Sequence, residues 1–138
     1  MKKAIFPGSF DPFHDGHNFV VQSAIEDGYE KIYIVVSWNE NKIRTNSFEK
    51  SANEIKKRYK NNNKIKVMIN KNELTVDICK KLDCYNIIRG YRDDKDLDYE
   101  RELKKIYIKA ENKINFILYK SNLNIRSNKL KNDIIKSD

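Results

Sequence analysis

Short apolar segments alternate with segments of helical periodicity along the chain, and this alternation limits the fold more than any other feature of the sequence. The clearest apolar run, at 31–37, is rich in Val, Ile and Tyr, as in a strand that helices cover on both faces. Similar runs lie at 4–6, 65–69, 85–88 and 114–119. Segments of helical periodicity follow at 16–27, 47–59, 75–82 and 96–110, and a last helix is expected from residue 127. Because parallel strands require crossover connections, this order predicts an α/β fold with a five-stranded parallel sheet and helices on both faces.

The length and composition of the chain fit one such domain. A chain of 138 residues has the length of a single domain, and no linker rich in Pro, Gly or Ser divides it, so we expect one domain over residues 1–138. No apolar run is long enough to predict a membrane span, and the N-terminus lacks the apolar core of a signal peptide. Two cysteines, Cys79 and Cys84, provide no disulfide framework, which favours a reducing, cytoplasmic setting.

The chain carries an excess of positive charge, with 28 Lys and Arg against 20 Asp and Glu and a formal net charge of +8. Much of the excess lies in residues 101–138, and a positive surface of this kind attracts nucleic acids or polyphosphates. Aromatic residues do not interleave with these charges in a stacking pattern. We therefore interpret the charge as a solvated lysine-rich face and expect no specific nucleic-acid partner.

The segment after the first expected strand, residues 6–17, holds both histidines, both prolines and two of the four glycines of the chain. Gly8 permits a tight turn or a close backbone approach. His14 and His17 stand at the expected start of the first helix, where unpaired N–H groups and the helix dipole favour an anion. These residues predict a phosphate-binding site. A metal site and a purely structural histidine pair are the alternatives. The chain has no third histidine for the former, and the latter leaves the surrounding glycines and prolines unexplained.

Two further segments that follow expected strands carry positive side chains. Lys42 follows the second strand, and Arg89-Gly90-Tyr91-Arg92 follows the fourth. Arginine suits planar, bidentate phosphate contacts, and glycine lets the backbone approach a nucleotide. The acidic residues that come next are explained about as well by capping of the following helix as by function. Because ligands of such folds bind beyond the carboxyl ends of the strands, we expect the segments after strands one, two and four to form one site.

The histidine segment, His14-Asp15-Gly16-His17, resembles the His-x-Gly-His signature of the nucleotidyltransferase superfamily. The longer run from Pro7 to Pro12 is similar to that of bacterial phosphopantetheine adenylyltransferases. The same family has an Arg-Gly-x-Arg segment followed by Asp-x-x-Tyr-Glu, which residues 89–92 and 96–100 match. The resemblance extends over essentially the whole chain and implies a Rossmann-like nucleotidyltransferase fold.

The resemblance also implies an activity and a set of site residues. The activity is transfer of AMP from ATP to the phosphate of 4′-phosphopantetheine by direct in-line attack, giving dephospho-coenzyme A and pyrophosphate. Mg²⁺ would accompany the ATP, with no metal ligand from the protein, and the assembly would be a cytoplasmic homohexamer. The implied catalytic residues are His17, Lys42 and Arg92. The implied ATP-binding residues are Ser9, Phe10, His14, His17, Gly90, Tyr91, Arg92, Glu100, Asn124, Ile125, Arg126, Ser127 and Asn128. The implied acceptor-binding residues are Ser9, Lys42, Thr75 and Arg89.

The chain departs from the family pattern at several positions near the acceptor. Tyr107 stands where the family typically has an asparagine that contacts the pantetheine arm. The proline and second lysine that usually accompany Lys42 are missing, and Arg44 is a candidate for the second charge. Of the Ser/Thr-rich turn before the last helix, only Ser127 is present. Two alternatives therefore stay open: a related enzyme with another acceptor, such as nicotinate mononucleotide, and an inactive relative that binds RNA.

Overall fold

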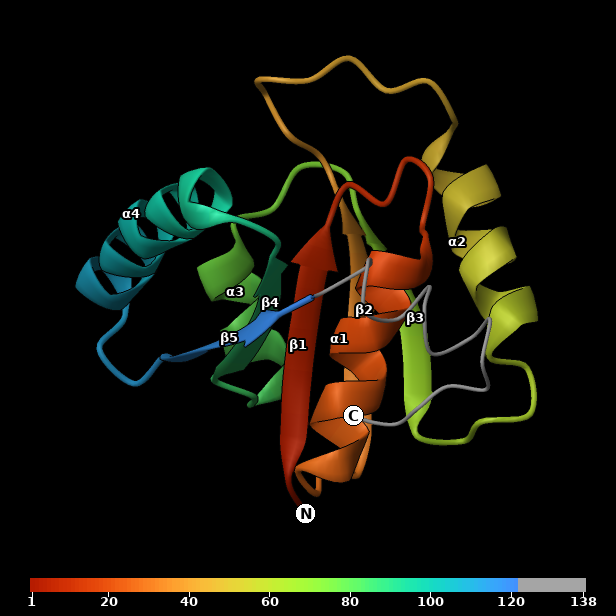
Figure 1. Cartoon of the computed structure of the whole chain (residues 1–138), viewed down its shortest axis with the longest axis horizontal. Helices are drawn as coiled ribbons and strands as arrows, with labels where there is room; N and C mark the ends of the chain where they lie inside the picture. The colour runs from red at the N-terminus through yellow and green to blue at the C-terminus, as the bar shows by residue number, and fades with distance from the viewer. Residues whose placement is uncertain (122–138) are drawn as a thin grey trace.

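The computed structural model describes residues 1–121, which form a five-stranded parallel sheet with helices on both faces (Figure 1). The strands are β1 (Lys3–Gly8), β2 (Lys31–Ser37), β3 (Ile65–Asn70), β4 (Asn86–Tyr91) and β5 (Asn115–Lys120). The helices are α1 (Asp15–Glu26), α2 (Phe48–Arg58), α3 (Thr75–Leu82) and α4 (Asp94–Ala110). The strand order is β3-β2-β1-β4-β5, and every neighbouring pair is parallel. The predicted fold class is confirmed, and the helix expected from Ser127 lies outside the described residues.

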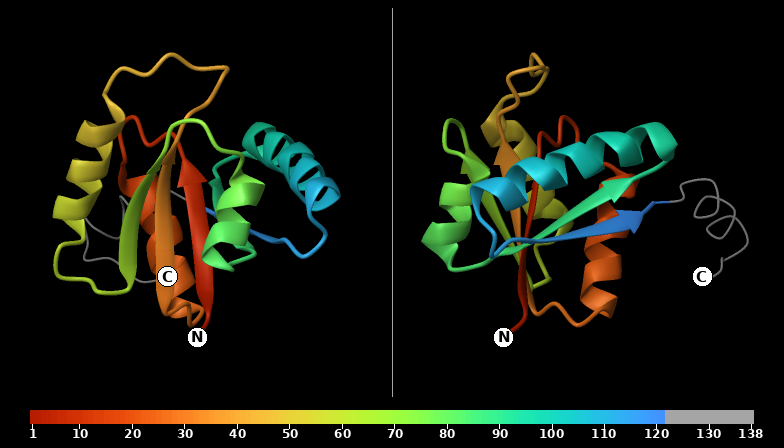
Figure 2. Two further views of the ribbon diagram at one scale, coloured as in Figure 1. Left: turned by 180° about the vertical axis from the view of Figure 1, so that it is seen from behind. Right: turned by 90° about the vertical axis from the view of Figure 1, so that its left-hand side faces the viewer.

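Alternation of side chains along the strands builds a hydrophobic core on each face of the sheet. Ala4 and Phe6 of β1 pack with α1 and α2 on one face. Ile5 between them packs with α3 and with the partly buried residues of α4 on the other face. In the right-hand view of Figure 2, α1 (orange) and α3 (green) lie on opposite sides of β1 (red). Since a strand with two buried faces has no polar side, this packing explains the nearly continuous apolar runs in the sequence.

Most element boundaries agree with the sequence within a few residues, and Ser47 caps α2 by accepting a hydrogen bond from the Lys50 N–H, as expected. The main difference is at β4, which continues to Tyr91, so that Arg89 and Gly90 lie inside the strand rather than after it. A side chain at Gly90 would place its Cβ 2.5 Å from Cγ2 of Val20 on α1. Close packing of α1 on β4 therefore favours glycine at this position, whether or not a nucleotide also approaches it.

The strand order places β1 at the centre of the sheet, between β2 and β4. The chain extends outward from β1 through β2 and β3, then returns to the other side of β1 to form β4 and β5. A reversal of this kind leaves a crevice at the carboxyl ends of the central strands, where doubly wound sheets bind ligands. Within residues 1–121, no helix combines the length and the apolar character that crossing a bilayer requires.

Candidate active site

A cleft of about 1050 Å³ opens at the carboxyl ends of β1, β2 and β4. Its volume lies just above the range of about 300–1,000 Å³ that is usual for small-molecule sites, so it is a large site of that kind. Every site residue that the sequence analysis names within residues 1–121 lines it: Ser9, Phe10, His14, His17, Lys42, Thr75, Arg89, Gly90, Tyr91, Arg92 and Glu100. The remaining expected residues, Asn124, Ile125, Arg126, Ser127 and Asn128, lie outside the described residues.

His14 and His17 cap the N-terminus of α1 reciprocally. The Nδ1 atom of His14 accepts a hydrogen bond from the Gly16 N–H at 3.1 Å, and Nδ1 of His17 accepts one from the His14 N–H at 3.0 Å. The two rings are stacked, with their centroids 3.8 Å apart. Because each Nδ1 atom accepts a hydrogen bond, the neutral form of each ring carries its proton on Nε2. Each histidine therefore has one N–H donor, on its outer nitrogen.

His17 lies among aromatic rings, with those of Phe10 and Phe13 at centroid distances of 4.9 and 5.1 Å. Burial is the main cause that lowers the pKa of His17, to about 3, and the nearby positive charge of Arg89 contributes. Partial burial and the charge of Arg92 also lower the pKa of His14. Both imidazoles are therefore neutral hydrogen-bond donors near pH 7.

The loop after β1 is shaped by packing around Phe10. Its backbone has a φ of 46°, and its buried ring meets that of Phe6 edge-on at 5.0 Å. A Cβ atom at Gly8 would come within 2.8 Å of the Phe10 ring. Gly8 thus allows the ring to turn inward, beside His17, while Ser9 and the backbone of the loop line the cleft.

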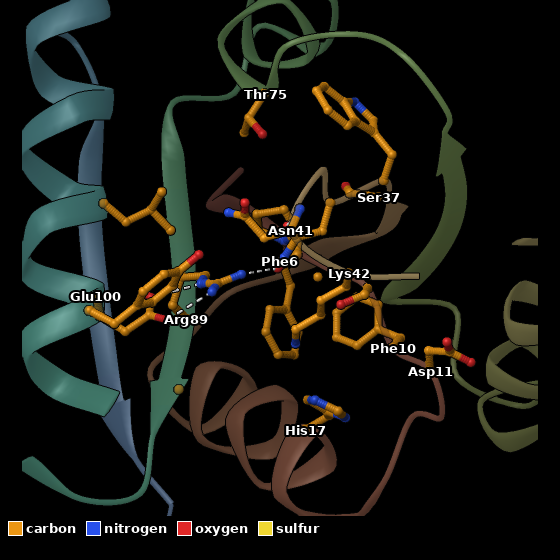
Figure 3. Close-up of a pocket in the computed structure, with 18 of the residues that line it drawn as sticks. Phe6, Phe10, Asp11, His17, Ser37, Asn41, Lys42, Thr75, Arg89 and Glu100 are labelled. Carbon is orange, nitrogen blue, oxygen red and sulfur yellow. Dashed lines mark hydrogen bonds and ion pairs between the residues drawn. The ribbon is translucent and has the colours of Figure 1, made fainter. Parts of the chain in front are cut away.

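Arg89 is fixed by three hydrogen bonds of 2.8 Å (Figure 3). Two of them join its Nε and Nη2 to the two carboxylate oxygens of Glu100, and the third joins Nη1 to the carbonyl oxygen of Pro7. Glu100 is only 5% exposed, so the pair is shielded from water. A guanidinium has five N–H groups, which leaves two for a ligand in the cleft. In this geometry Glu100 orients Arg89, a relation that the sequence analysis did not foresee.

The other two expected cations lie nearer the mouth of the cleft. Arg92 donates from Nε to the Asp96 carboxylate at 3.1 Å, and its side chain is exposed. Lys42 is exposed in the loop after β2. Figure 3 shows Lys42, Arg89 and His17 around one cavity, although they come from three different elements. This arrangement combines neutral donors with one buried and two exposed positive groups, which suits polyphosphates.

The acceptor side of the expected site has an unforeseen contact. The Tyr107 hydroxyl of α4 donates to Oγ1 of Thr75, the first residue of α3, at 3.2 Å. Apolar side chains near this contact also line the cleft, and two of them are well exposed: Leu74 at 63% and Ile106 at 62%. The sequence analysis did not name Ile106 as a site residue, and its only signal is an apolar side chain where a helix is expected to face solvent.

A family model described as cytidylyltransferase-like matches residues 5–133. Curated proteins named phosphopantetheine adenylyltransferase are similar in sequence. That of Mycoplasma mycoides subsp. mycoides SC is 42% identical over 100 residues, covering 72% of this chain and 71% of the relative. That of Lactobacillus gasseri is 37% identical over 118 residues, covering 86% and 70%. A solved structure described as a lipopolysaccharide core biosynthesis protein from Thermoplasma volcanium has a TM-score of 0.60 at 19% identity, covering 88% of this chain and 97% of that chain, and shares the fold.

The lowered pKa of His17 predicts that the folded protein loses stability as the pH falls from 7 to 5. The unfolded chain takes up a proton on this histidine near its ordinary pKa of about 6.5, whereas the folded protein does so only near 3. Replacing His17→Asn keeps an acceptor near the position of Nδ1 but removes the titration. Urea unfolding at both pH values should therefore show a smaller loss in this variant than in the wild type. Equal losses in the two proteins would contradict the neutral, buried state of His17.

Proposed function

Since this chain belongs to the cytidylyltransferase-like family and, within it, to the phosphopantetheine adenylyltransferases, we propose that it transfers AMP from ATP to the phosphate of 4′-phosphopantetheine. The products are dephospho-coenzyme A and pyrophosphate, and the reaction belongs to coenzyme A biosynthesis. The observation that supports this most strongly is the single cleft that gathers the neutral histidine pair, Arg89 and Lys42. The volume of this cleft, about 1050 Å³, lies just above the range usual for small-molecule sites.

The chemistry is the approach of two anions with charge developing on the transferred phosphate. An oxygen of the acceptor phosphate forms a bond to the α-phosphorus, and the bond from that phosphorus to the bridging oxygen breaks, so that its electron pair leaves on pyrophosphate. The acceptor is already an anion and needs no general base. Catalysis then depends on positioning and charge stabilisation by groups that do not reorganise during the step.

Each group in the cleft has a proposed part in that step. The Nε2–H of His17 donates to the α-phosphate as charge builds there, and Lys42 and Arg89 bind the acceptor phosphate. Ser9 and the backbone at Phe10 lie beside these groups and contact both substrates. Four of the remaining groups hold ATP: His14, Gly90, Tyr91 and Arg92. Glu100, which the family resemblance places at the ATP site, holds Arg89 at the acceptor phosphate.

We propose that Mg²⁺ enters with the triphosphate rather than on protein ligands. Within residues 1–121, no group of three or more His, Cys, Asp and Glu side chains is arranged to hold a metal ion. The carboxylates of Asp11 and Glu100 in the cleft accept hydrogen bonds from protein N–H groups. Phosphate oxygens and water are ligands that Mg²⁺ prefers, and the ion supplies charge neutralisation there.

A cytoplasmic location and a homohexameric assembly are also proposed, on the family resemblance. The thiols of Cys79 and Cys84 are free and buried, as in a protein of a reducing compartment.

The proposed reaction is tested by pyrophosphate release from ATP with a panel of acceptors. We expect turnover with 4′-phosphopantetheine and none with nicotinate mononucleotide. The His17→Asn protein should turn over about 10²–10³-fold more slowly, the usual effect of losing one preorganised transition-state donor. Turnover with nicotinate mononucleotide alone would refute the acceptor. Absence of pyrophosphate release together with RNA binding at physiological salt would favour the inactive RNA-binding relative.

The contact between Tyr107 and Thr75 predicts weak binding of the pantetheine arm. The Tyr107 phenol donates a hydrogen bond to the Thr75 hydroxyl. It stands in place of the asparagine typical of the family, whose amide both donates and accepts hydrogen bonds. Replacing Tyr107→Asn should lower the KM for phosphopantetheine several-fold and leave kcat and the KM for ATP almost unchanged, because the arm is remote from the reacting phosphorus. The Tyr107→Phe protein, which frees Thr75 without adding an amide, is the matched control. An unchanged acceptor KM in the asparagine variant would show that the arm lies elsewhere.

A further inference from the structure

Asp11, in the loop after β1, holds the end of the loop that carries Lys42. Its Oδ2 accepts a hydrogen bond from the Thr45 N–H at 2.6 Å. Its Oδ1 accepts two more, from the backbone N–H and the side-chain amide of Asn46, at 2.9 and 2.7 Å. The hydrogen bond from Thr45 is the main cause that lowers the pKa of Asp11, so this carboxylate stays ionised. One side chain of the first loop thus binds two successive residues of the second.

Arg44 joins the same two loops through a side chain of the second loop, which donates to the backbone of the first. Its Nη1 donates to the Ser9 carbonyl oxygen at 2.8 Å, and its Nε donates to the Asn46 carbonyl oxygen at 3.0 Å. Its Nη2 donates to Oγ of Ser51 at 2.9 Å. Three of the five N–H groups of Arg44 therefore bind within the protein, and the residue also lines the cleft, so it stays a candidate for the second charge.

Lys42 lies between these contacts and a turn at the start of its loop. The turn is closed by the Lys42 N–H, which donates to the Asn39 carbonyl oxygen at 3.0 Å. The next residue, Ile43, is 98% exposed, so hydrophobic packing does not fix the tip of the loop. Hydrogen bonds from Asp11 and Arg44 hold the other end. The position of the Lys42 backbone relative to Ser9 and Phe10 therefore depends on polar contacts between the two loops.

We propose that Asp11 and Arg44 are positioning residues that clamp the loop after β2 onto the loop after β1, so that Lys42 meets the acceptor phosphate in line with the α-phosphate site; this rests on the proposed function. The clamp fixes Lys42, which orients the acceptor, relative to the loop after β1, which lies beside His17. Neither residue needs to touch a substrate. Their effect on the reaction passes through Lys42 and through the Ser9 backbone.

A double-mutant cycle between Asp11 and Lys42 tests the clamp. Replacing Asp11→Asn leaves a side chain that cannot accept all three hydrogen bonds, and we expect the KM for phosphopantetheine to rise about tenfold, as on losing one charged hydrogen bond. In the Lys42→Ala background, the same substitution should change this KM by less than about twofold, because the group that it positions is gone. The control is Glu49→Gln. The Glu49 carboxylate forms an ion pair with Lys71 at 2.8 Å, and neither residue lines the cleft, so this substitution should leave the KM unchanged.

Equal factors in the two backgrounds, or a lowered Tm with an unchanged KM, would overturn the proposal. If Asp11→Asn does not fold, the same cycle with Arg44→Gln gives the same decision. Hydrogen exchange at the Thr45 and Asn46 amides tests the clamp without turnover: Asp11→Asn should abolish their protection, and unaltered protection would refute it. Failure of the proposed function is separate, because it appears in the wild-type protein as absent turnover with phosphopantetheine.

Discussion

The reciprocal capping of α1 by its two histidines is the interaction on which the rest of the site depends. The His14 N–H donates to Nδ1 of His17, and Nδ1 of His14 accepts from the Gly16 N–H. These two bonds satisfy backbone donors at a helix start, and they also fix the tautomer of both rings. The outer Nε2–H groups are thereby made available to an anion without any rearrangement. The two hydrogen bonds that stabilise the start of α1 therefore also orient the Nε2–H donors of the site.

The site separates neutral donors from charged groups. His17 is kept neutral by its aromatic surroundings, so it donates a hydrogen bond without adding a positive charge. Permanent charge comes from Arg89, which the buried Glu100 and the Pro7 carbonyl hold in place, and from the exposed Lys42. Arg89 lies within β4, whereas Lys42 lies in a loop and is exposed. This division suits a reaction in which ATP and a second phosphate have to be brought together.

The sequence was sufficient for the fold, but not for the contacts among the candidate site residues. The alternation of strands and helices predicted the sheet, and the density of His, Gly and Pro predicted the first loop. Arg89 was placed after β4 rather than inside it, because Arg and Gly interrupt the apolar run that marks a strand. Gly90 was assigned to nucleotide approach, and its close packing against Val20 of α1 was not foreseen. The hydrogen-bonded pairs Tyr107–Thr75 and Asp11–Thr45 are 32 and 34 positions apart in the sequence. A local sequence pattern does not predict contacts between such distant residues.

The protonation state of His17 is the central claim, and ¹⁵N NMR of the imidazole nitrogens measures it directly. In protein labelled at histidine, spectra recorded between pH 5 and 8 should show His17 as the neutral tautomer with its proton on Nε2 throughout. The lowered pKa of about 3 and the acceptor role of Nδ1 both require this result. A titration of the His17 resonances near the ordinary histidine pKa of about 6.5, or a tautomer with its proton on Nδ1, would contradict the account.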